Sequence, residues 1–439
     1  MALSTPAPAP YAEVQVELAE RPDDSPLKVS FEPLSEADVD ARLVALARPS
    51  TTVFDASHGR GADAVSFQPC RTYKSQDRYV VKQLDVYGKK WTFTGVFDGH
   101  LGDATVEHTA YHLPIIVTEF LEKTLAGPSS PTPPPEIVSE LLSRSITSFD
   151  DAIAGDVLDL FPGGLPSLAT RSDEEIRRVI NDFDGTGVNY KKARLCMYGT
   201  TALVALVDPE WKNLWIAGLG DCEAVLVSST PDGRWHSEVV TNIHNGENKA
   251  EIRRVQREHP REPECILNGR VLGTIAPFRC IGDTPFKQPA EFTRRILYNL
   301  YPGVPDTTLW ENFLSRNHTP PYISSVPEVV HRRLGAPLTS VAGAPSHKIP
   351  YFLILTTDGL SELFEEFSRQ ERADDWAACV GSALQSSSQT HGSASSENLA
   401  LRLLRMALGG DDTDQVSQLL TLNMGTPWMD DTTIVVQTL

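Results

Sequence analysis

The chain has 439 residues, enough for one large domain with insertions or for two domains of average size. Its composition, 41% hydrophobic and 22% charged, is that of a soluble globular protein with ample apolar residues for a core. The net charge of −19 argues against a general nucleic-acid-binding protein, which would present a basic face.

The cysteines and the N-terminal segment bear on the cellular compartment. The six cysteines are scattered and form no CxxC pair, which is typical of a reduced intracellular protein. No apolar run approaches the ~18 residues needed to cross a bilayer. Met1–Pro10 has neither an apolar signal core nor arginines, so we expect a cytoplasmic or nuclear protein. The mitochondrial matrix is the alternative if the N-terminus is incomplete.

The first quarter of the chain moves from an irregular extension into strands. Residues 1–64 are rich in Pro, Ala and acidic residues and are predicted to be a partly disordered extension, with a weak helix over Glu36–Ala47. The main domain is predicted over residues 65–439. Arg78–Tyr87 and Trp91–Phe97 partly alternate and flank a Gly-Lys-Lys turn, which predicts a β-hairpin.

Helical signals come next. Apolar residues recur at intervals of three and four over Ala104–Lys123, which predicts a helix. The Pro-rich residues 126–136 predict an inserted loop, because proline fits neither a helix interior nor a central strand. A second helix is predicted over Glu136–Ala154, followed by a loose stretch to about Tyr190.

The second half returns to strands. Thr200–Val207 and Leu214–Ala217 are apolar runs on either side of a turn and predict another hairpin. Ala250–Glu258 predicts a charged helix, and residues 335–348 and 382–396 predict inserted loops. Strands joined by hairpins and separated by helices indicate an α+β fold with largely antiparallel sheets.

Four strand-like apolar runs carry an aspartate at one end. These aspartates are Asp98, Asp221, Asp358 and Asp430, and the last is followed by Asp431. A carboxylate at a strand end is held rigidly, and several such ends at one sheet edge would repel one another unless divalent cations bind between them. The pattern therefore favours a metal-dependent reaction.

Each of these aspartates also has a simpler interpretation. Asp98-Gly99 and Asp358-Gly359 are common turn dipeptides, in which the carboxylate accepts backbone hydrogen bonds. Asp77 beside an arginine would pass for a surface ion pair. Two adjacent acids before an apolar strand, as at Asp430, are harder to explain without a site.

Taken in order, the motifs resemble those of a known family, the PPM-type (type 2C) metal-dependent protein serine/threonine phosphatases. The motifs are Gln76-Asp77, Asp98-Gly99-His100-Leu101-Gly102, Gly220-Asp221-Cys222-Glu223, Asp358-Gly359-Leu360-Ser361-Glu362 and Asp430-Asp431-Thr432-Thr433. The resemblance spans roughly residues 65–439. Further stretches, His244–Asn248, Arg257–Pro260 and Gly269–Asp283, resemble the branch that contains pyruvate dehydrogenase phosphatase.

The resemblance implies a four-layer α/β/β/α sandwich of two antiparallel sheets flanked by helices, with two and possibly three Mg²⁺ or Mn²⁺ ions. Asp98 would bridge two ions, with the carbonyl of Gly99 on one of them. Asp358 and Asp430 would complete the coordination of the other ion, and Asp77 would orient water at the metals. Asp221 and Glu362 match positions that bind a third ion. Asp283 would act at the metals or on their water.

The implied reaction is the hydrolysis of phosphoserine and phosphothreonine in proteins. His100 would protonate the leaving oxygen, with water as the nucleophile. Phosphorylated proteins would be the partners, and the sequence does not indicate the oligomeric state. Arg71 is a candidate for gripping the substrate phosphate. Arg270 and Arg279, in a locally basic stretch, would face the substrate, although a helix surface with mixed charges is the simpler interpretation.

Some residues depart from the family pattern. Gln76 stands where a glutamate is usual, Leu101 where the residue is normally small, and Cys222-Glu223 where Ser-Arg is usual. These departures keep an alternative open, a pseudophosphatase that binds phosphoproteins with weak or no turnover. A two-metal nuclease would fit the carboxylates but not the acidic composition.

Overall fold

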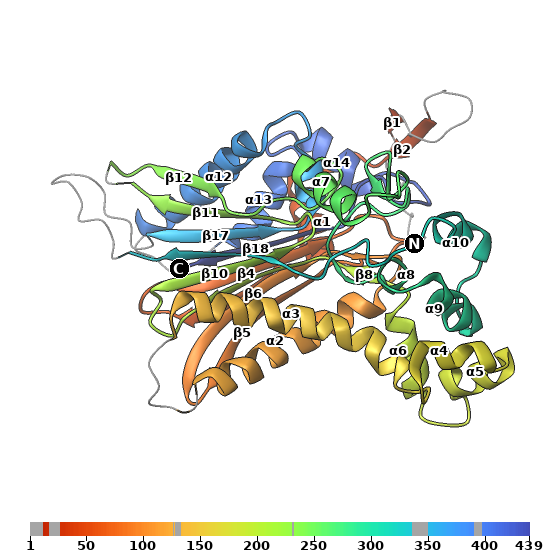
Figure 1. The fold of residues 1–439 in the computed structure, drawn as a ribbon. Helices are drawn as coiled ribbons and strands as arrows, with labels where there is room; N and C mark the ends of the chain where they lie inside the picture. The colour runs from red at the N-terminus through yellow and green to blue at the C-terminus, as the bar shows by residue number, and fades with distance from the viewer. Residues whose placement is uncertain are drawn as a thin grey trace. The chain divides into compact units, whose positions relative to one another are not determined.

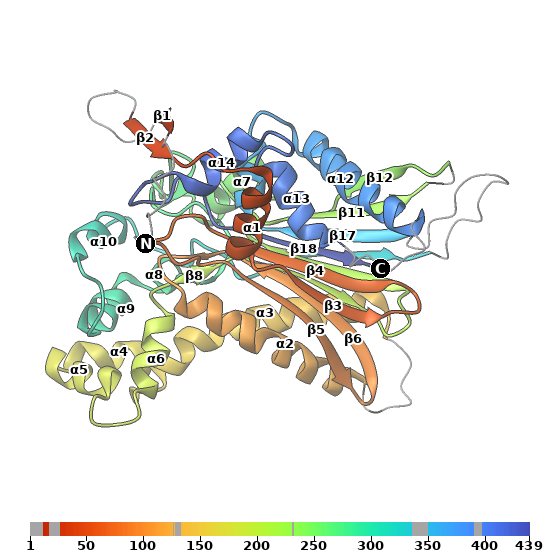
Figure 2. The ribbon, with the colours of Figure 1, turned by 180° about the vertical axis from the view of Figure 1, so that it is seen from behind.

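Two antiparallel sheets form the framework of the chain, one in each of two units (Figures 1 and 2). In the computed structural model the described residues are 12–16, 27–125, 127, 133–230, 232–335, 350–389 and 397–439. The first unit comprises Met1–Ser75, Val227–Glu238 and Thr339–Leu439, and the second comprises Gln76–Leu226 and Val239–Leu338. The predicted combination of helices with antiparallel sheets is confirmed.

The sheet of the second unit has five strands in the order β16-β10-β9-β6-β5. The strands are β5 (Arg78–Val86), β6 (Lys89–Phe97), β9 (Ala202–Val207), β10 (Asn213–Leu219) and β16 (Glu328–Arg333). Strand β9 lies in the middle and is buried along its length, which is why it reads as an unbroken apolar run. Both predicted hairpins, β5 with β6 and β9 with β10, are confirmed by their antiparallel pairing.

Two long helices lie side by side on this sheet, α2 (Ala104–Leu125) and α3 (Pro135–Leu158) (Figures 1 and 2). Buried residues of α2 recur at helical spacing, as at Leu113, Val117 and Leu121, and this stripe contacts the sheet. Helix α3 begins with a proline, which fits the first turn because its missing N–H would have no partner there. Both helices were predicted within a few residues of these bounds.

The stretch before Tyr190 is helical, contrary to the prediction of a loose segment. It contains α4 (Gly164–Ser167), α5 (Asp173–Asn181) and α6 (Val188–Leu195). Helix α5 begins with a capping box in which Ser172 accepts from the backbone of Glu175 and Glu175 accepts from that of Ser172. Ile176 and Ile180 provide its buried face. The periodic segment is too short to stand out, but the capping signal is present in the sequence.

The sheet of the first unit has six strands in the order β12-β11-β17-β18-β4-β3. Its strands are β3 (Ser50–Asp55), β4 (Arg60–Phe67), β11 (Glu223–Ser229), β12 (Trp235–Val239), β17 (Tyr351–Thr356) and β18 (Thr432–Thr438). Of β11 and β12, Val227–Ser229 and Trp235–Glu238 belong to the first unit. Helices α1 (Glu36–Ala47), α12 (Arg369–Gln389), α13 (Leu399–Ala407) and α14 (Thr413–Thr421) belong to the same unit. Helix α13 contacts both β4 and β18, so it covers the centre of this sheet.

The predicted domain boundary between residues 64 and 65 falls inside β4. Strand β3 and helix α1, which precede it, contact β4 and form part of the first unit. The predicted loops at 126–136 and 335–348 lie mostly outside the described residues. Of the loop predicted at 382–396, residues 382–389 form the end of α12.

A second apolar cluster within the second unit contains Val255, Leu272, Phe278, Phe313 and Tyr322. It lies under α7 (Lys249–Glu258) and α10 (Thr307–Leu314).

A buried ion-pair network ties α7 to a following segment. Glu251, 4% exposed, accepts hydrogen bonds from Arg254 and from Arg279, whose Nη2 lies 2.6 Å from Oε1. Burial raises the pKa of Glu251, but the two guanidinium groups more than offset this, so that the pKa falls from 4.5 to about 2.

This network predicts a specific loss of stability in acid. The unfolded chain binds a proton at Glu251 below pH 4.5, whereas the folded chain does so only near pH 2. The free energy of unfolding should therefore fall as the pH drops through this window. Glu251→Gln should lower it by about 3 kcal/mol at pH 7, because two arginines lose their buried partner, and should flatten its dependence on pH. Urea unfolding between pH 7 and pH 3 measures both effects.

Glu258→Gln is the matched control, since Glu258 also accepts from Arg254 but is exposed. It should cost less than about 1 kcal/mol. Equal losses in the two variants, or an unchanged pH dependence in Glu251→Gln, would contradict the account.

Candidate functional site

A small three-stranded sheet in the second unit brings three distant segments together. It has the order β15-β8-β7, with β7 (Gly99–His100), β8 (Gly199–Thr200) and β15 (Ile281–Gly282). Gly99 pairs with Thr200, and Ile281 pairs with the same residue from the other side. His100 is therefore held beside Asp283, which follows β15, and Asp98 directly precedes β7.

His100 and Asp283 form a close contact in this sheet. His100 Nε2 lies 2.6 Å from Asp283 Oδ2, and the two side chains are 22% and 1% exposed. Burial lowers the pKa of His100, but the charge and hydrogen bond of Asp283, with a contribution from Asp221, outweigh burial and raise the pKa above its usual value. The Cys280 thiol lies 2.9 Å from the same Asp283 oxygen.

Glycines make this contact possible. A Cβ built on Gly199 would lie 2.0 Å from Asp283 Oδ2 and 2.3 Å from His100 Nε2. Any side chain at position 199 would thus push the two groups apart. Gly282 has φ of +80° and lies against the backbone of Tyr198, so it too is required by its geometry.

Asp98 and Asp221 place carboxylate oxygens within 4.8 Å of each other, at the ends of β6 and β10. The backbone of Asp98 is fixed on both sides, since its N–H donates to Thr201 Oγ1 and its carbonyl accepts from Thr201 N and Thr200 Oγ1. Asn245 Nδ2 donates to Asp221 Oδ2 at 3.3 Å. Two carboxylates held this close are a suitable binding site for a divalent cation.

The Gln76-Asp77 segment lies against Gly99. A Cβ on Gly99 would meet the carbonyl oxygen of Gln76 at 2.6 Å, so only glycine allows this approach. The Asp77 side chain is 2% exposed. The segment that carries Asp77 thus lies beside the residue that follows Asp98.

The first unit gathers its own carboxylates. Asp358 begins α11 (Asp358–Glu362) directly after β17, and Asp430 directly precedes β18 with Asp431, so the antiparallel pairing of β17 with β18 brings them together. Asp358, Glu362 and Asp430 offer oxygens within 4.8 Å of one another. A Cβ on Gly359 would meet the carbonyl oxygen of Asp431 at 2.2 Å, so the glycine allows the helix start to approach β18.

The departures from the family pattern have visible structural consequences. Leu101 is 64% exposed and has φ of +63°. This left-handed backbone conformation favours glycine and costs a leucine about 1 kcal/mol. Glu223 begins β11 and is 1% exposed. The Cys222 thiol lies 3.1 Å from Thr201 Oγ1, beside the residue that fixes Asp98.

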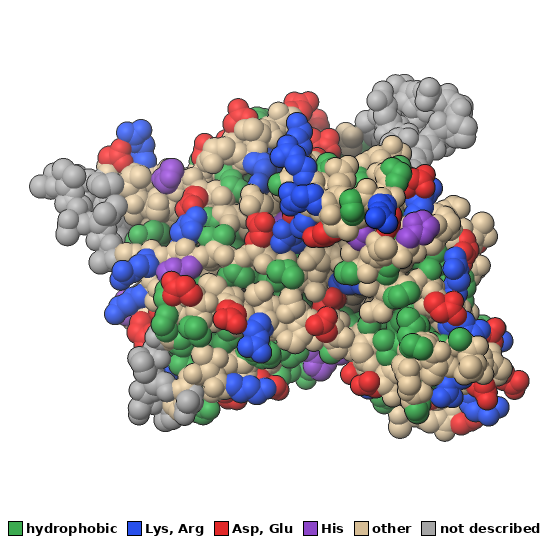
Figure 3. Space-filling view, viewed as in Figure 1, with side chains coloured by type: hydrophobic (Ala, Val, Ile, Leu, Met, Phe, Trp, Pro, Cys, Tyr) green, Lys and Arg blue, Asp and Glu red, His purple; other side chains and the backbone are tan. Residues whose placement is uncertain are grey.

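The three predicted substrate arginines lie in different surroundings. Arg279 is committed to its buried ion pair with Glu251 and also donates to the carbonyl of Val326. Arg270 is exposed and donates to the carbonyl of Thr274, and Arg71 is exposed in a turn of the first unit. Figure 3 shows lysine and arginine side chains mixed with acidic ones over the region of α7.

Sequence reasoning missed several residues that hold the site. Gly199, Thr200 and Thr201 carry no chemistry of their own, yet they fix Asp98 and leave room for His100. Asp150 is also buried, and its Oδ1 accepts from Gly282 N at 2.8 Å and from Lys287 Nζ at 2.7 Å. Of these residues, only Gly199, just before the apolar run of β9, could have been singled out from the sequence.

The donor atoms fit hard divalent cations. Each unit supplies carboxylate oxygens, and no cysteine or histidine takes part in the Asp98–Asp221 pair or the Asp358–Glu362–Asp430 group. Ions such as Mg²⁺, Mn²⁺ and Ca²⁺ prefer such oxygen ligands, whereas zinc sites are usually built with nitrogen or sulfur.

A search of the described helices found none with the length and apolar character that crossing a membrane requires.

Comparison with known proteins gives consistent matches. A family model described as protein phosphatase 2C matches residues 168–374. A protein phosphatase 2C homolog of Schizosaccharomyces pombe is 27% identical over 388 residues, covering 84% of this chain and 78% of the relative. The human mitochondrial pyruvate dehydrogenase (acetyl-transferring) phosphatase 1 is 30% identical over 278 residues, covering 57% of this chain. The aligned region spans only 49% of that human protein.

A solved structure supports the fold. The crystal structure of a serine-threonine phosphatase 2C from Toxoplasma gondii has a TM-score of 0.50 at 15% identity, covering 89% of this chain and 99% of that one. At this identity the likeness concerns the fold alone, and it confirms the predicted fold class.

The close approach at Gly199 gives a direct test of the His100–Asp283 contact. Gly199→Ala should separate the two side chains, so that His100 loses the attraction that raises its pKa. We expect a lower His100 pKa than in the wild-type protein, measured by an NMR pH titration of the imidazole protons. Gly155→Ala, in α3 with open space around its Cβ, is the control and should leave this pKa unchanged. A wild-type pKa in Gly199→Ala would refute the contact.

Proposed function

From its similarity to protein phosphatase 2C proteins, we propose that the chain is a member of this family and hydrolyses phosphoserine and phosphothreonine in proteins with Mg²⁺ or Mn²⁺ as cofactor. The observation that carries this proposal is the gathering of strand-end carboxylates in each unit, together with the contact between His100 and Asp283 in the second unit. The names of the relatives are those of phosphatases, so a binding module without turnover is not favoured.

We assign the metal ligands to both units. In the second unit they are Asp98, the Gly99 carbonyl and Asp221, with Asp77 orienting water. In the first unit they are Asp358, Glu362 and Asp430. When bound, divalent cations lower the pKa of water and neutralise charge on the phosphoryl group.

The histidine would supply the proton for the leaving group. Since Nε2 of His100 faces Asp283, Nδ1 is the nitrogen left to donate a proton to the seryl or threonyl oxygen. Asp283 holds the ring in one orientation and favours its protonated form, so we assign it a positioning role at His100. No cysteine nucleophile is needed, which suits the buried and partly buried thiols of the chain.

The predicted cytoplasmic or nuclear location, with the mitochondrial matrix as the alternative, stays a prediction. The same holds for the physiological substrate. The human relative named above is called a pyruvate dehydrogenase phosphatase, which makes a phosphorylated subunit of such an enzyme a reasonable first protein substrate to test.

The metal ligands are tested by hydrolysis of a phosphothreonine peptide. We expect activity with Mn²⁺ or Mg²⁺, none with EDTA, and a fall in kcat of at least ~10²-fold in Asp98→Asn, because the loss of a carboxylate ligand would weaken the cation site. Asp85→Asn, an exposed aspartate on β5 that pairs with Lys90, is the matched control and should be fully active. Activity that survives EDTA would overturn the proposal.

The exposed Arg270 allows a test of protein-substrate recognition. Arg270→Glu should raise KM for a phosphoprotein by about fivefold, from the loss of about 1 kcal/mol of charge attraction, while leaving KM for p-nitrophenyl phosphate unchanged. Arg144→Glu, at an exposed arginine on α3, serves as the control for charge alone. Equal effects on the two substrates would remove Arg270 from the substrate surface.

A further inference from the structure

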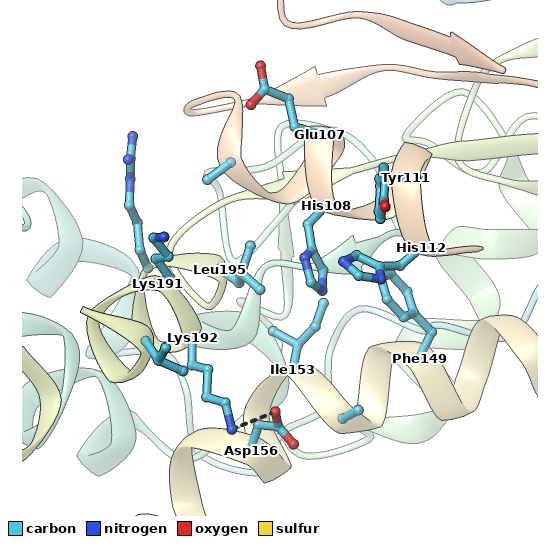
Figure 4. Close-up of a pocket in the computed structure, with 14 residues that line it drawn as sticks. Glu107, His108, Tyr111, His112, Phe149, Ile153, Asp156, Lys191, Lys192 and Leu195 are labelled. Carbon is cyan, nitrogen blue, oxygen red and sulfur yellow. Dashed lines mark ion pairs between the residues drawn. The ribbon is translucent and has the colours of Figure 1, made fainter. Parts of the chain in front are cut away.

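A pocket lies in the second unit between α2, α3 and α6, apart from the residues assigned to catalysis (Figure 4). Its volume is about 560 Å³, which is within the range of small-molecule sites. Residues from all three helices line it, among them His108, Phe149, Ile153, Lys191, Arg194 and Leu195. Neither the family match nor the proposed function gives this pocket a role.

The inner wall of the pocket is flat and aromatic. The His108 ring stacks on the Phe149 ring, with the ring centres 5.5 Å apart and the ring planes at 14° to each other (Figure 4). The centre of the His112 ring lies 4.3 Å from that of His108. Burial, together with the neighbouring His112, lowers the pKa of His108 to about 4, so this ring is neutral at pH 7. The buried side chain of Ile153 adds apolar surface.

The rim of the pocket is cationic, in a chain whose net charge is −19. Three charged residues on the rim have ion-pair partners. Lys192 Nζ lies 3.0 Å from Asp156 Oδ2, and Glu107 Oε1 lies 2.7 Å from Arg78 Nη2. Lys191 is exposed and forms no ion pair within the described part of the chain. Arg194 Nη2 lies 4.0 Å from Asp103 Oδ1, and the guanidinium also lies over the Tyr198 ring, 5.6 Å from its centre. The pocket therefore combines a neutral aromatic wall with two cations that have little charge compensation.

We propose that this pocket binds a small organic anion. The flat apolar body of the ligand would lie on the His108–Phe149 stack, and its carboxylate or sulfonate group would reach Lys191 and Arg194. The volume suits a molecule of one or two rings rather than a protein segment, and the rim would repel a cation. This proposal concerns binding and does not depend on the phosphatase reaction.

The first test compares anions with a neutral molecule of the same shape. Naphthalene-2-sulfonate and 2-naphthoate are titrated against 2-naphthylmethanol by calorimetry at low salt. We expect the anions to bind with Kd of about 0.1–1 mM, as suits ligands of this size, and the alcohol at least about fivefold more weakly. If neither anion binds, or if the alcohol binds equally well, the proposal is wrong.

Variants then locate the site. Ala152 lines the pocket and is exposed on α3. Ala152→Trp should therefore fill the pocket and abolish binding while leaving the packing of the hydrophobic core unchanged. Lys191→Glu should raise Kd about tenfold, by replacing an attraction with a repulsion. Ser148→Trp on α3 and Lys123→Glu on α2 lie outside the pocket and should bind like the wild-type protein. Unchanged binding in Ala152→Trp or Lys191→Glu would place the ligand elsewhere and overturn the assignment.

Discussion

The repulsion between carboxylates that the backbone holds close together is the constraint on which the rest of the site depends. Asp98 and Asp221 bring oxygens within 4.8 Å of each other, where two unit charges repel by about 3 kcal/mol or more in a protein environment. Neither side chain is fully exposed, so solvent relieves this only in part. A divalent cation between the carboxylates turns the repulsion into a binding energy, which is why the arrangement calls for a metal.

The small sheet β15-β8-β7 keeps that constraint in place. Its residues carry little chemistry, but Thr200 and Thr201 hold the backbone of Asp98, and Gly199 leaves space for the contact of His100 with Asp283. Any side chain at position 199 would break the contact between His100 and Asp283. The backbone thus fixes both the carboxylate pair and the position of His100.

The aspartates that we propose as metal ligands stand out in the sequence because each follows or precedes an apolar run, and both features are local. The supporting residues could not, because Thr201 meets Asp98 across 103 positions and Asp283 meets His100 across 183. The same reason explains Arg279. It was predicted to face the substrate, but it is held by Glu251, 28 positions away, and no local pattern announces such a partner.

The central claim is that the carboxylates of this chain bind divalent cations that the hydrolysis of phosphoproteins requires. The most direct measurement is Mn²⁺ binding by electron paramagnetic resonance, with phosphopeptide turnover followed in the same samples. The account predicts at least two bound ions per chain and a rate that rises as the second ion binds. Full turnover in protein that holds no Mn²⁺ or other divalent cation would contradict it.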